Sequence, residues 1–305
     1  MITLIVRRLL LAIPVLFIIV SLTFLLMRIA PGNPFSEGKN IPKEIMAQLE
    51  QQYDLHGTIA HQYGQYLWKL LHGDLGISTQ YRSRTVNEII AQALPVSMVL
   101  GSVAYVLALG MGLTLGALAA VRHNRPADRW LMFGALLGIS IPNFVLAPIL
   151  VLIFAIGLGW LPVLGWGSLD QLVLPAICLS IPFTASIARL TRGGLLEVLQ
   201  LDFVRTARAK GLPEREVLFR HALRVAILPV IGYSGPAVAG ILTGSIVIET
   251  LFGIPGIGRF FVNSILNRDP FVTCGVVLVF SVFVIFFNLL TDLLYVAVDR
   301  RVKLA

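Results

Sequence analysis

Long apolar runs alternate with polar segments along this chain. A hydrocarbon core requires about 20 apolar residues per helix, so runs of this length predict about six transmembrane helices in an all-α integral membrane protein. The third run contains Pro142 and Pro148 and the fourth contains Pro175 and Pro182, and we expect these prolines to break both helices. The six runs are Leu9–Met27, Leu94–Val121, Leu131–Leu161, Leu172–Ala188, Val225–Ile248 and Phe271–Val298.

The polar segments divide the chain into three parts. Residues 1–30 form a retained N-terminal span, because their apolar core is longer than that of a signal peptide and no small-x-small cleavage site follows. Residues 31–92 form an extracytoplasmic insertion with helical patterns at 41–55 and 62–76, the second ended by Gly73. It is either a small cap on the outer face or a pair of surface helices that only link two spans. Residues 93–305 hold five further spans and a cytoplasmic loop at about 189–224.

Composition excludes a soluble enzyme and, once the charges are placed, a nucleic-acid-binding protein. Of the 305 residues, 57% are hydrophobic and only 13% are charged, about half the charged fraction of a soluble domain. The net charge of +8 is spread over several short loops rather than one stripe. The histidines lack metal-ligand spacing, and Cys178 and Cys274 fall in apolar runs as small buried hydrophobes.

The distribution of basic residues predicts the orientation. With the N-terminus in the cytoplasm, the inside segments hold 16 Lys and Arg and the outside segments hold seven, while Arg28 is counted with the N-terminal span 1–30. Since cytoplasmic loops carry the excess of basic residues, both termini are predicted to be cytoplasmic.

One basic segment, VRTARAKGLPEREVLFRHALRVAILP (204–229), carries turn and capping signals that charge alone does not explain. We expect Asp202 to cap a helix over Phe203–Lys210 and Gly211 to adopt the left-handed conformation that ends it. Pro213 suits the first position of a second helix, with Glu214 and another acid in its first turn. A helix held at such a corner indicates a docking element, and the alternative is a solvated loop shaped only by membrane topology.

The same segment resembles the EAA loop of permease subunits in binding-protein-dependent ABC importers of the oligopeptide/dipeptide branch. Arg205-Thr206-Ala207 stands at the triplet, Gly211 at the glycine and Leu228-Pro229 at the ending, while the triplet's Glu is absent. The stretches RRLLLAIPVLFIIVSLTFLLMRIAPGNPF, GDLGIS, ALPVSMVLG, ARLTRGGLLEVL and GSIVIETLFGIPGIGRFFVNSILNRD also resemble landmarks of the branch's B-type subunit, in collinear order.

This resemblance implies a type I ABC importer permease fold in a bacterial inner membrane. It implies a channel-forming subunit without enzymatic activity or cofactor, whose ATP and Mg²⁺ are bound by two separate ABC ATPase subunits. Consistent with this, the chain has no P-loop motif. The other implied partners are a second homologous permease subunit, forming a heterodimer, and an extracytoplasmic binding protein. The implied ATPase-coupling residues are Arg205, Thr206, Ala207, Arg208, Lys210, Gly211 and Leu212, with Leu212 in a cleft of the ATPase.

Two acids near membrane depth are further candidates, because burying them is costly. Glu249 precedes the TLFGIPGIG stretch, where it could pair with Arg259 or Arg268. The resemblance marks this stretch as a gate or binding-protein dock, and the alternative is a structural turn. Asp292 either lines a cavity or pairs with a basic residue at the cytoplasmic end. The candidate gate or dock residues are Glu249, Phe252, Pro255, Gly256 and Gly258.

The leading function is therefore import of di- or oligopeptides. Within the same branch the solute could instead be nickel or glutathione. A secondary transporter working alone is a third hypothesis, although most spans lack ionisable residues and the two halves show no repeat.

Overall fold

The computed structural model describes residues 2–29, 57–81 and 84–298. Within these ranges the regular elements are helices, with one isolated bridge between Ile77 and Thr85. The predicted helix at 41–55 lies outside the described residues. The helices are α1 (Ile2–Ile29), α3 (Ile59–Leu71), α4 (Val86–Val121), α5 (Pro126–Ser140), α6 (Asn143–Leu150), the π-helix η1 (Val151–Gly157), α7 (Leu169–Val198), α8 (Asp202–Ala209), α9 (Glu214–Glu216), the π-helix η2 (Val217–Ala222), α10 (Leu223–Ala226), α11 (Leu228–Phe252), α12 (Ile257–Leu266) and α13 (Pro270–Val298).

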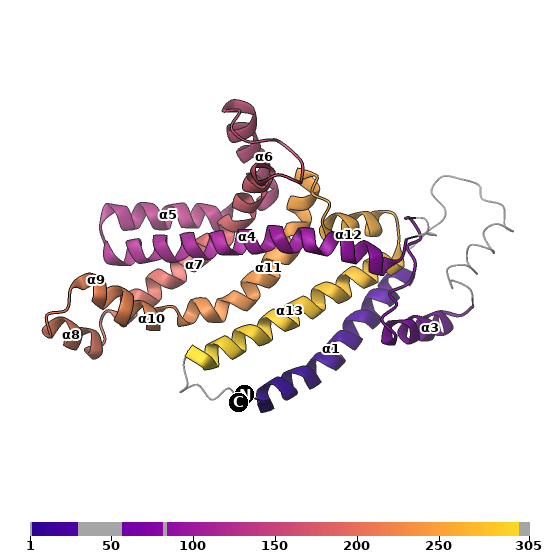
Figure 1. The fold of residues 1–305 in the computed structure, drawn as a ribbon, viewed down its shortest axis with the longest axis horizontal. Helices are drawn as coiled ribbons and strands as arrows, with labels where there is room; N and C mark the ends of the chain where they lie inside the picture. Colours follow the sequence, from indigo (N-terminus) through magenta and orange to yellow (C-terminus); the bar gives the residue numbers. More distant parts are fainter. Residues whose placement is uncertain (1, 30–56, 82–83, 299–305) are drawn as a thin grey trace.

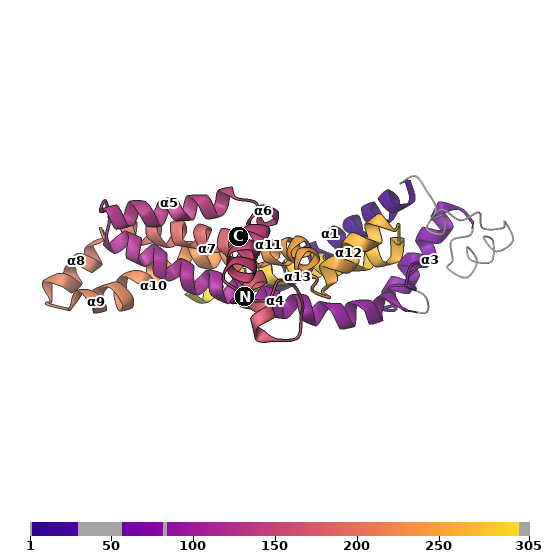
Figure 2. The same cartoon turned by 90° about the horizontal axis from the view of Figure 1, so that it is seen from above.

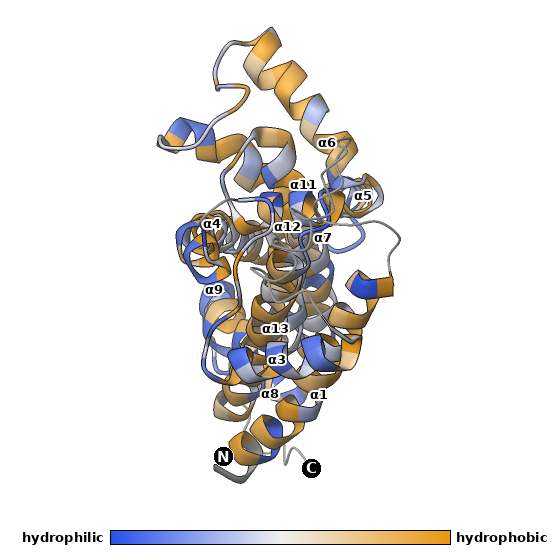
Figure 3. Cartoon of the chain, turned by 90° about the vertical axis from the view of Figure 1, so that its right-hand side faces the viewer, coloured by the Kyte–Doolittle hydropathy of each residue, from blue (hydrophilic) through white to orange (hydrophobic). Residues whose placement is uncertain are grey.

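Five helices, α1, α4, α7, α11 and α13, are long and apolar enough to cross a membrane. They run lengthwise through an elongated bundle, with α8 and α9 at one end and α3 near the other (Figures 1 and 2). Apolar residues dominate these helices, while many of the hydrophilic residues lie in α3, α8 and α9 (Figure 3). The prediction of an all-helical membrane protein is confirmed.

The third apolar run differs from a single span. It forms two helices, α5 and the α6–η1 pair, which meet at an angle of 110° around Pro142. The 15 residues of α5 cover only about 22 Å, less than the hydrocarbon thickness of about 30 Å. The chain therefore has five spans, or six if this bent pair crosses the membrane as one.

The prediction that Pro175 and Pro182 break the fourth span is wrong. Both lie inside α7, which continues without interruption to Val198, beyond the apolar run. Close packing against α4 explains how the backbone tolerates them, because neighbouring helices hold a proline-containing membrane helix in place.

Small residues allow α4 and α7 to approach closely. A Cβ added at Gly112 would lie 2.6 Å from the Ile187 side chain, and one at Gly116 would lie 2.5 Å from the carbonyl oxygen of Ala188. Gly112 and Gly116 form a G-x-x-x-G pair, the spacing that brings membrane helices into backbone contact. This pair therefore allows α4 and α7 to cross in close contact.

At the end of the bundle opposite α8 and α9, α3 packs into the protein core. Tyr66 is 3% exposed, and its ring stacks on Phe24 of α1 at 5.6 Å and tilts against Phe271 of α13 at 6.3 Å. The helix predicted at 62–76 is present, and Gly73 has a positive φ of 77° just after its end. These contacts show that α3 packs against α1 and α13 rather than only linking two spans. The next span, α4, already begins at Val86.

Candidate functional sites

The segment after α7 folds into two helices joined by a sharp corner. Gly211 has φ = +78°, the left-handed conformation expected of the residue that ends α8. Both helix starts differ from the prediction by one residue, because Leu201 is the N-cap of α8 and Pro213 is the N-cap of α9. The predicted Asp202 cap is wrong: Asp202 lies in the first turn of α8, and its carboxylate lies 3.5 Å from the Arg205 guanidinium.

An apolar cluster around the C-terminal end of α7 holds the corner against the spans. Val204 is fully buried and Ala207 is 7% exposed. They pack with Leu195 and Val198 at the end of α7 and with Val217 of η2. Because Val204 and Ala207, the buried side chains of α8, pack in this cluster, the short helix is attached to the protein and is not a solvated loop.

An ion pair closes the corner on its exposed side. The guanidinium of Arg208 donates to both carboxylate oxygens of Glu214, at 3.1 and 2.6 Å. These hydrogen bonds raise the pKa of Arg208 and lower the pKa of Glu214. The pair therefore joins α8 to the first turn of α9 across Gly211.

The structure divides the seven predicted coupling residues into two groups. Ala207 is buried and Leu212 is half-buried against the same cluster, so both contribute to holding the corner in place. The remaining five are exposed, namely Arg205, Thr206, Arg208, Lys210 and Gly211. Phe203, in the first turn of α8, is 42% exposed.

The corner is connected to the membrane through an almost unbroken helical path. From Glu214 the chain passes through α9, η2 and α10 into α11. Where this path crosses α7, a Cβ added at Gly194 would lie 2.6 Å from the carbonyl oxygen of Ala226. The corner is thus joined to α11 by consecutive helical segments rather than by an extended linker.

Glu249 forms the centre of a second site, near the C-terminal end of α11. Its side chain is fully buried, and one carboxylate oxygen accepts from the backbone N–H of Gly258 at 2.7 Å. The neighbouring amide of Ile257 donates to Ser97 Oγ of α4 at 2.9 Å. The predicted pairing with Arg259 or Arg268 is wrong, because the carboxylate instead binds the positive N-terminal end of α12.

The glycines of this stretch make room for the carboxylate. A Cβ added at Gly256 would lie 2.4 Å from Glu249 Oε2, and one at Gly258 would lie 2.8 Å from the same oxygen. Of the five candidate gate or dock residues, only Pro255 is exposed, while Glu249, Phe252, Gly256 and Gly258 are buried. A docked partner cannot reach these four in this conformation, which favours the structural turn.

A second buried acid, Asp269, was not predicted from the sequence. Asp269 is the residue before Pro270, where α13 begins, and one of its oxygens accepts from the amide of Val272. The other accepts from Ser78 Oγ at 2.5 Å and from the Thr79 amide at 3.0 Å. An acid directly before proline and a long apolar run is typical of a helix start, and this signal could have identified it. Asp269 thus attaches the segment before α4 to α13.

Two further ion pairs connect separate helices. Arg8 lies 2.6 Å from Asp292 and joins α1 to α13, so the pairing alternative predicted for Asp292 is confirmed. Asp128 of α5, which the sequence analysis did not identify, is 3% exposed and accepts from Arg192 of α7 at 2.7 and 2.9 Å. Within the described residues no cluster of His, Cys, Asp or Glu fits a metal ion.

Comparison with known families covers nearly the whole chain. The family described as binding-protein-dependent transport system inner membrane component matches residues 112–304. The N-terminal family of such membrane components matches residues 1–101.

Two curated relatives are similar over almost their full length. The oligopeptide transport system permease protein OppB of Salmonella typhimurium is 47% identical over 305 residues, which cover 99% of this chain and 100% of that protein. The dipeptide transport system permease protein DppB of Bacillus subtilis is 44% identical over 289 residues, 95% of this chain and 94% of that protein.

A solved structure shares the fold. The crystal structure of an amino acid ABC transporter with histidines matches with a TM-score of 0.54 at 17% identity, covering 71% of this chain and 95% of that one.

Proposed function

The chain belongs to the family of inner-membrane components of binding-protein-dependent transport systems, and we propose that it is the channel-forming permease of an ATP-driven oligopeptide importer. Membership confirms the family predicted from the 204–229 segment. The peptide substrate is supported by the names of relatives that are 47% and 44% identical over nearly full length. Nickel and glutathione find no support among these relatives.

The single observation that carries the mechanism is the closed corner between α8 and α9. In this proposal an ATPase subunit binds the corner, and its nucleotide-driven movement passes through α9, η2 and α10 to the span α11. The exposed coupling residues Arg205, Thr206 and Lys210 contact the ATPase, and Arg208 holds the corner closed through its ion pair with Glu214. Ala207, Gly211 and Leu212 set the shape of the corner and its attachment to the spans.

The rest of the assembly follows from the same proposal. Two ATPase subunits supply the energy, a second homologous permease completes the channel as a heterodimer, and an extracytoplasmic protein delivers the peptide. Both termini and the corner face the cytoplasm, in agreement with the excess of Lys and Arg on that side. The segment 31–92 then lies on the outer face, where α3 packs against α1 and α13.

Affinity purification in a mild detergent tests the assembly, followed by uptake assays in proteoliposomes. The proposal expects ATPase subunits and a second permease to co-purify, and ATP-dependent uptake of tripeptides but not of nickel or glutathione. A purified chain that transports peptide alone and without ATP is a secondary transporter, and this result would contradict the proposal.

A further inference from the structure

A cavity between α4, α11 and α13 lies along the spans, beside the central part of α4 and the C-terminal half of α13. It has a volume of about 300 Å³. Its α4 wall runs from Met98 to Val106, at the centre of that helix, and its α11 wall runs from Ser234 to Leu242, at the centre of that one. Helices α11 and α4 also bound the Glu249 site, but the cavity contains none of the residues of that site.

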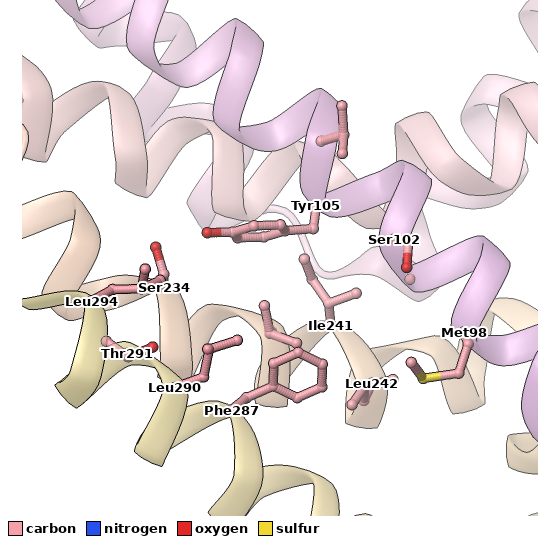
Figure 4. A pocket seen from close by; sticks show the side chains of 13 residues that line it. Met98, Ser102, Tyr105, Ser234, Ile241, Leu242, Phe287, Leu290, Thr291 and Leu294 are labelled. Atoms are coloured by element: carbon pink, nitrogen blue, oxygen red, sulfur yellow. The ribbon is translucent and has the colours of Figure 1, made fainter. Parts of the chain in front are cut away.

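The lining combines apolar side chains with hydroxyl groups and holds no charged residue. Apolar walls come from Met98, Ile241, Leu242, Phe287 and Leu290. Hydroxyl groups come from Ser102 and Tyr105 on α4, from Ser234 on α11 and from Thr291 on α13. Figure 4 shows the Tyr105 ring extending from α4 across the space, with its hydroxyl on the side where Ser234 and Leu294 lie.

Three of these hydroxyl groups have unused hydrogen-bonding capacity. Ser234 donates to the Val230 carbonyl of its own helix. By contrast, Ser102, Tyr105 and Thr291 make no side-chain hydrogen bond within the described part of the chain. A hydroxyl without a partner is costly in hydrocarbon, so a lipid chain is a poor occupant for this cavity. An occupant that offers both hydrogen-bonding groups and apolar surface fits the lining.

We propose that this cavity is a wall of the translocation path, in which Ser102, Tyr105 and Thr291 bind the main chain of the passing peptide. The inference rests on the proposed peptide import. A peptide presents amide donors and carbonyl acceptors at every residue, which match hydroxyl groups that donate and accept. The apolar wall receives its side chains, and the flexible Met98 adapts to different ones. Without a charged group, the wall does not select among peptides by charge.

Variants of the reconstituted importer test the cavity by uptake of a radiolabelled tripeptide. Tyr105→Phe and Ser102→Ala each delete one hydroxyl and should lower uptake at limiting peptide roughly five-fold, the effect of one lost hydrogen bond, with unchanged basal ATP hydrolysis. Ser102→Trp fills the cavity and should abolish uptake. Val99→Trp is the matched control, because Val99 is 47% exposed on the same helix but does not line the cavity; its uptake should be normal.

Wild-type uptake by both Tyr105→Phe and Ser102→Trp would overturn the proposal. If Ser102→Trp does not assemble, wild-type uptake by Tyr105→Phe is sufficient to overturn it. Photocrosslinking with a tripeptide that carries a benzophenone side chain reports where the peptide binds, and it does not require transport. Labelling within 98–106 or 234–242 supports the cavity, whereas labelling only elsewhere, or protection of the cavity by a lipid analogue, contradicts it. If the wild-type complex imports no peptide, the proposed function fails, and the labelling still decides the cavity.

Discussion

Arg208 and Glu214 face each other across the corner between α8 and α9, where the guanidinium contacts both carboxylate oxygens at 3.1 and 2.6 Å. The sequence analysis expected Arg208 to bind the ATPase. The structure shows that this side chain already has a partner within the chain, so its main effect is to fix the angle between the two helices.

A charge reversal separates these two roles of Arg208. Arg208→Glu places two acids at the corner and should lower ATP-driven uptake about ten-fold, which corresponds to about 1.4 kcal/mol of coupling. Its effect on unfolding should stay below about 1 kcal/mol, because both side chains are more than one-third exposed.

The double variant Arg208→Glu with Glu214→Arg is the matched control, since it restores an ion pair of opposite polarity. Recovery of uptake supports the intramolecular role. If the double variant transports no better than the single one, Arg208 instead contacts an acidic group of the ATPase.

Substitution at Gly211 tests the shape of the corner. At φ = +78° a β-branched residue is strained, by about 1–2 kcal/mol, although no atom lies within 4 Å of an added Cβ. Gly211→Val should therefore reduce co-purification of the ATPase and reduce uptake.

Gly73 offers an unusually close control for Gly211. It has φ = +77° and equally open surroundings, but it follows α3 at the other end of the bundle. Gly73→Val should cost similar stability and leave ATPase association normal. Equal loss of association in both variants would mean that general destabilisation, rather than the corner, causes the effect.

The packing around Glu249 predicts that an alanine at Gly256 destabilises the protein, whereas an alanine at Gly193, away from this site, does not. Gly256→Ala places a methyl group 2.4 Å from Glu249 Oε2, and such overpacking costs about 1–3 kcal/mol. Gly193→Ala, within α7 and with no neighbour inside 4 Å, should be neutral or slightly stabilising. Unfolding in detergent measures both, and equal stability of the two variants would contradict the packing around Glu249.

The burial of Asp269 predicts that the free energy of unfolding depends on pH. Burial raises its pKa above the usual range, and the donors around its carboxylate limit the rise. At a pH between the unfolded and the folded pKa, the folded chain therefore keeps the carboxyl proton of Asp269, which the unfolded chain has released. Its contribution to stability is therefore complete below the unfolded pKa and decreases as pH rises through the folded pKa. Asp269→Asn should remove this slope from the unfolding free energy, and an unchanged slope would refute the assignment.

The sequence predicted the spans and the corner because both depend on local signals. Apolar runs set the five long helices, and a glycine followed by Leu-Pro set the left-handed turn at Gly211. The 110° bend at Pro142 differs from the uninterrupted α7, although both segments contain prolines. Proline alone did not decide between them, because packing of α7 on α4 holds the helix together.

Contacts between residues that are far apart in the sequence could not be predicted from it. Asp128 and Arg192 are 64 positions apart and Ser78 and Asp269 are 191 apart, so no spacing rule connects them. The position of Glu249 relative to α12 was missed for a different reason. Its partner is a backbone amide rather than a charged side chain, and the sequence suggested only the nearby arginines.

The corner as the ATPase contact is the central claim, and a single-cysteine crosslink tests it most directly. The two native cysteines are buried, so a cysteine introduced by Thr206→Cys on the exposed face of α8 is the accessible thiol. In the assembled complex it should crosslink to the ATPase through a short thiol-reactive linker. Leu71→Cys on α3, where Leu71 is 82% exposed, should give no such product. An ATPase crosslink from Leu71→Cys and none from Thr206→Cys would contradict the account.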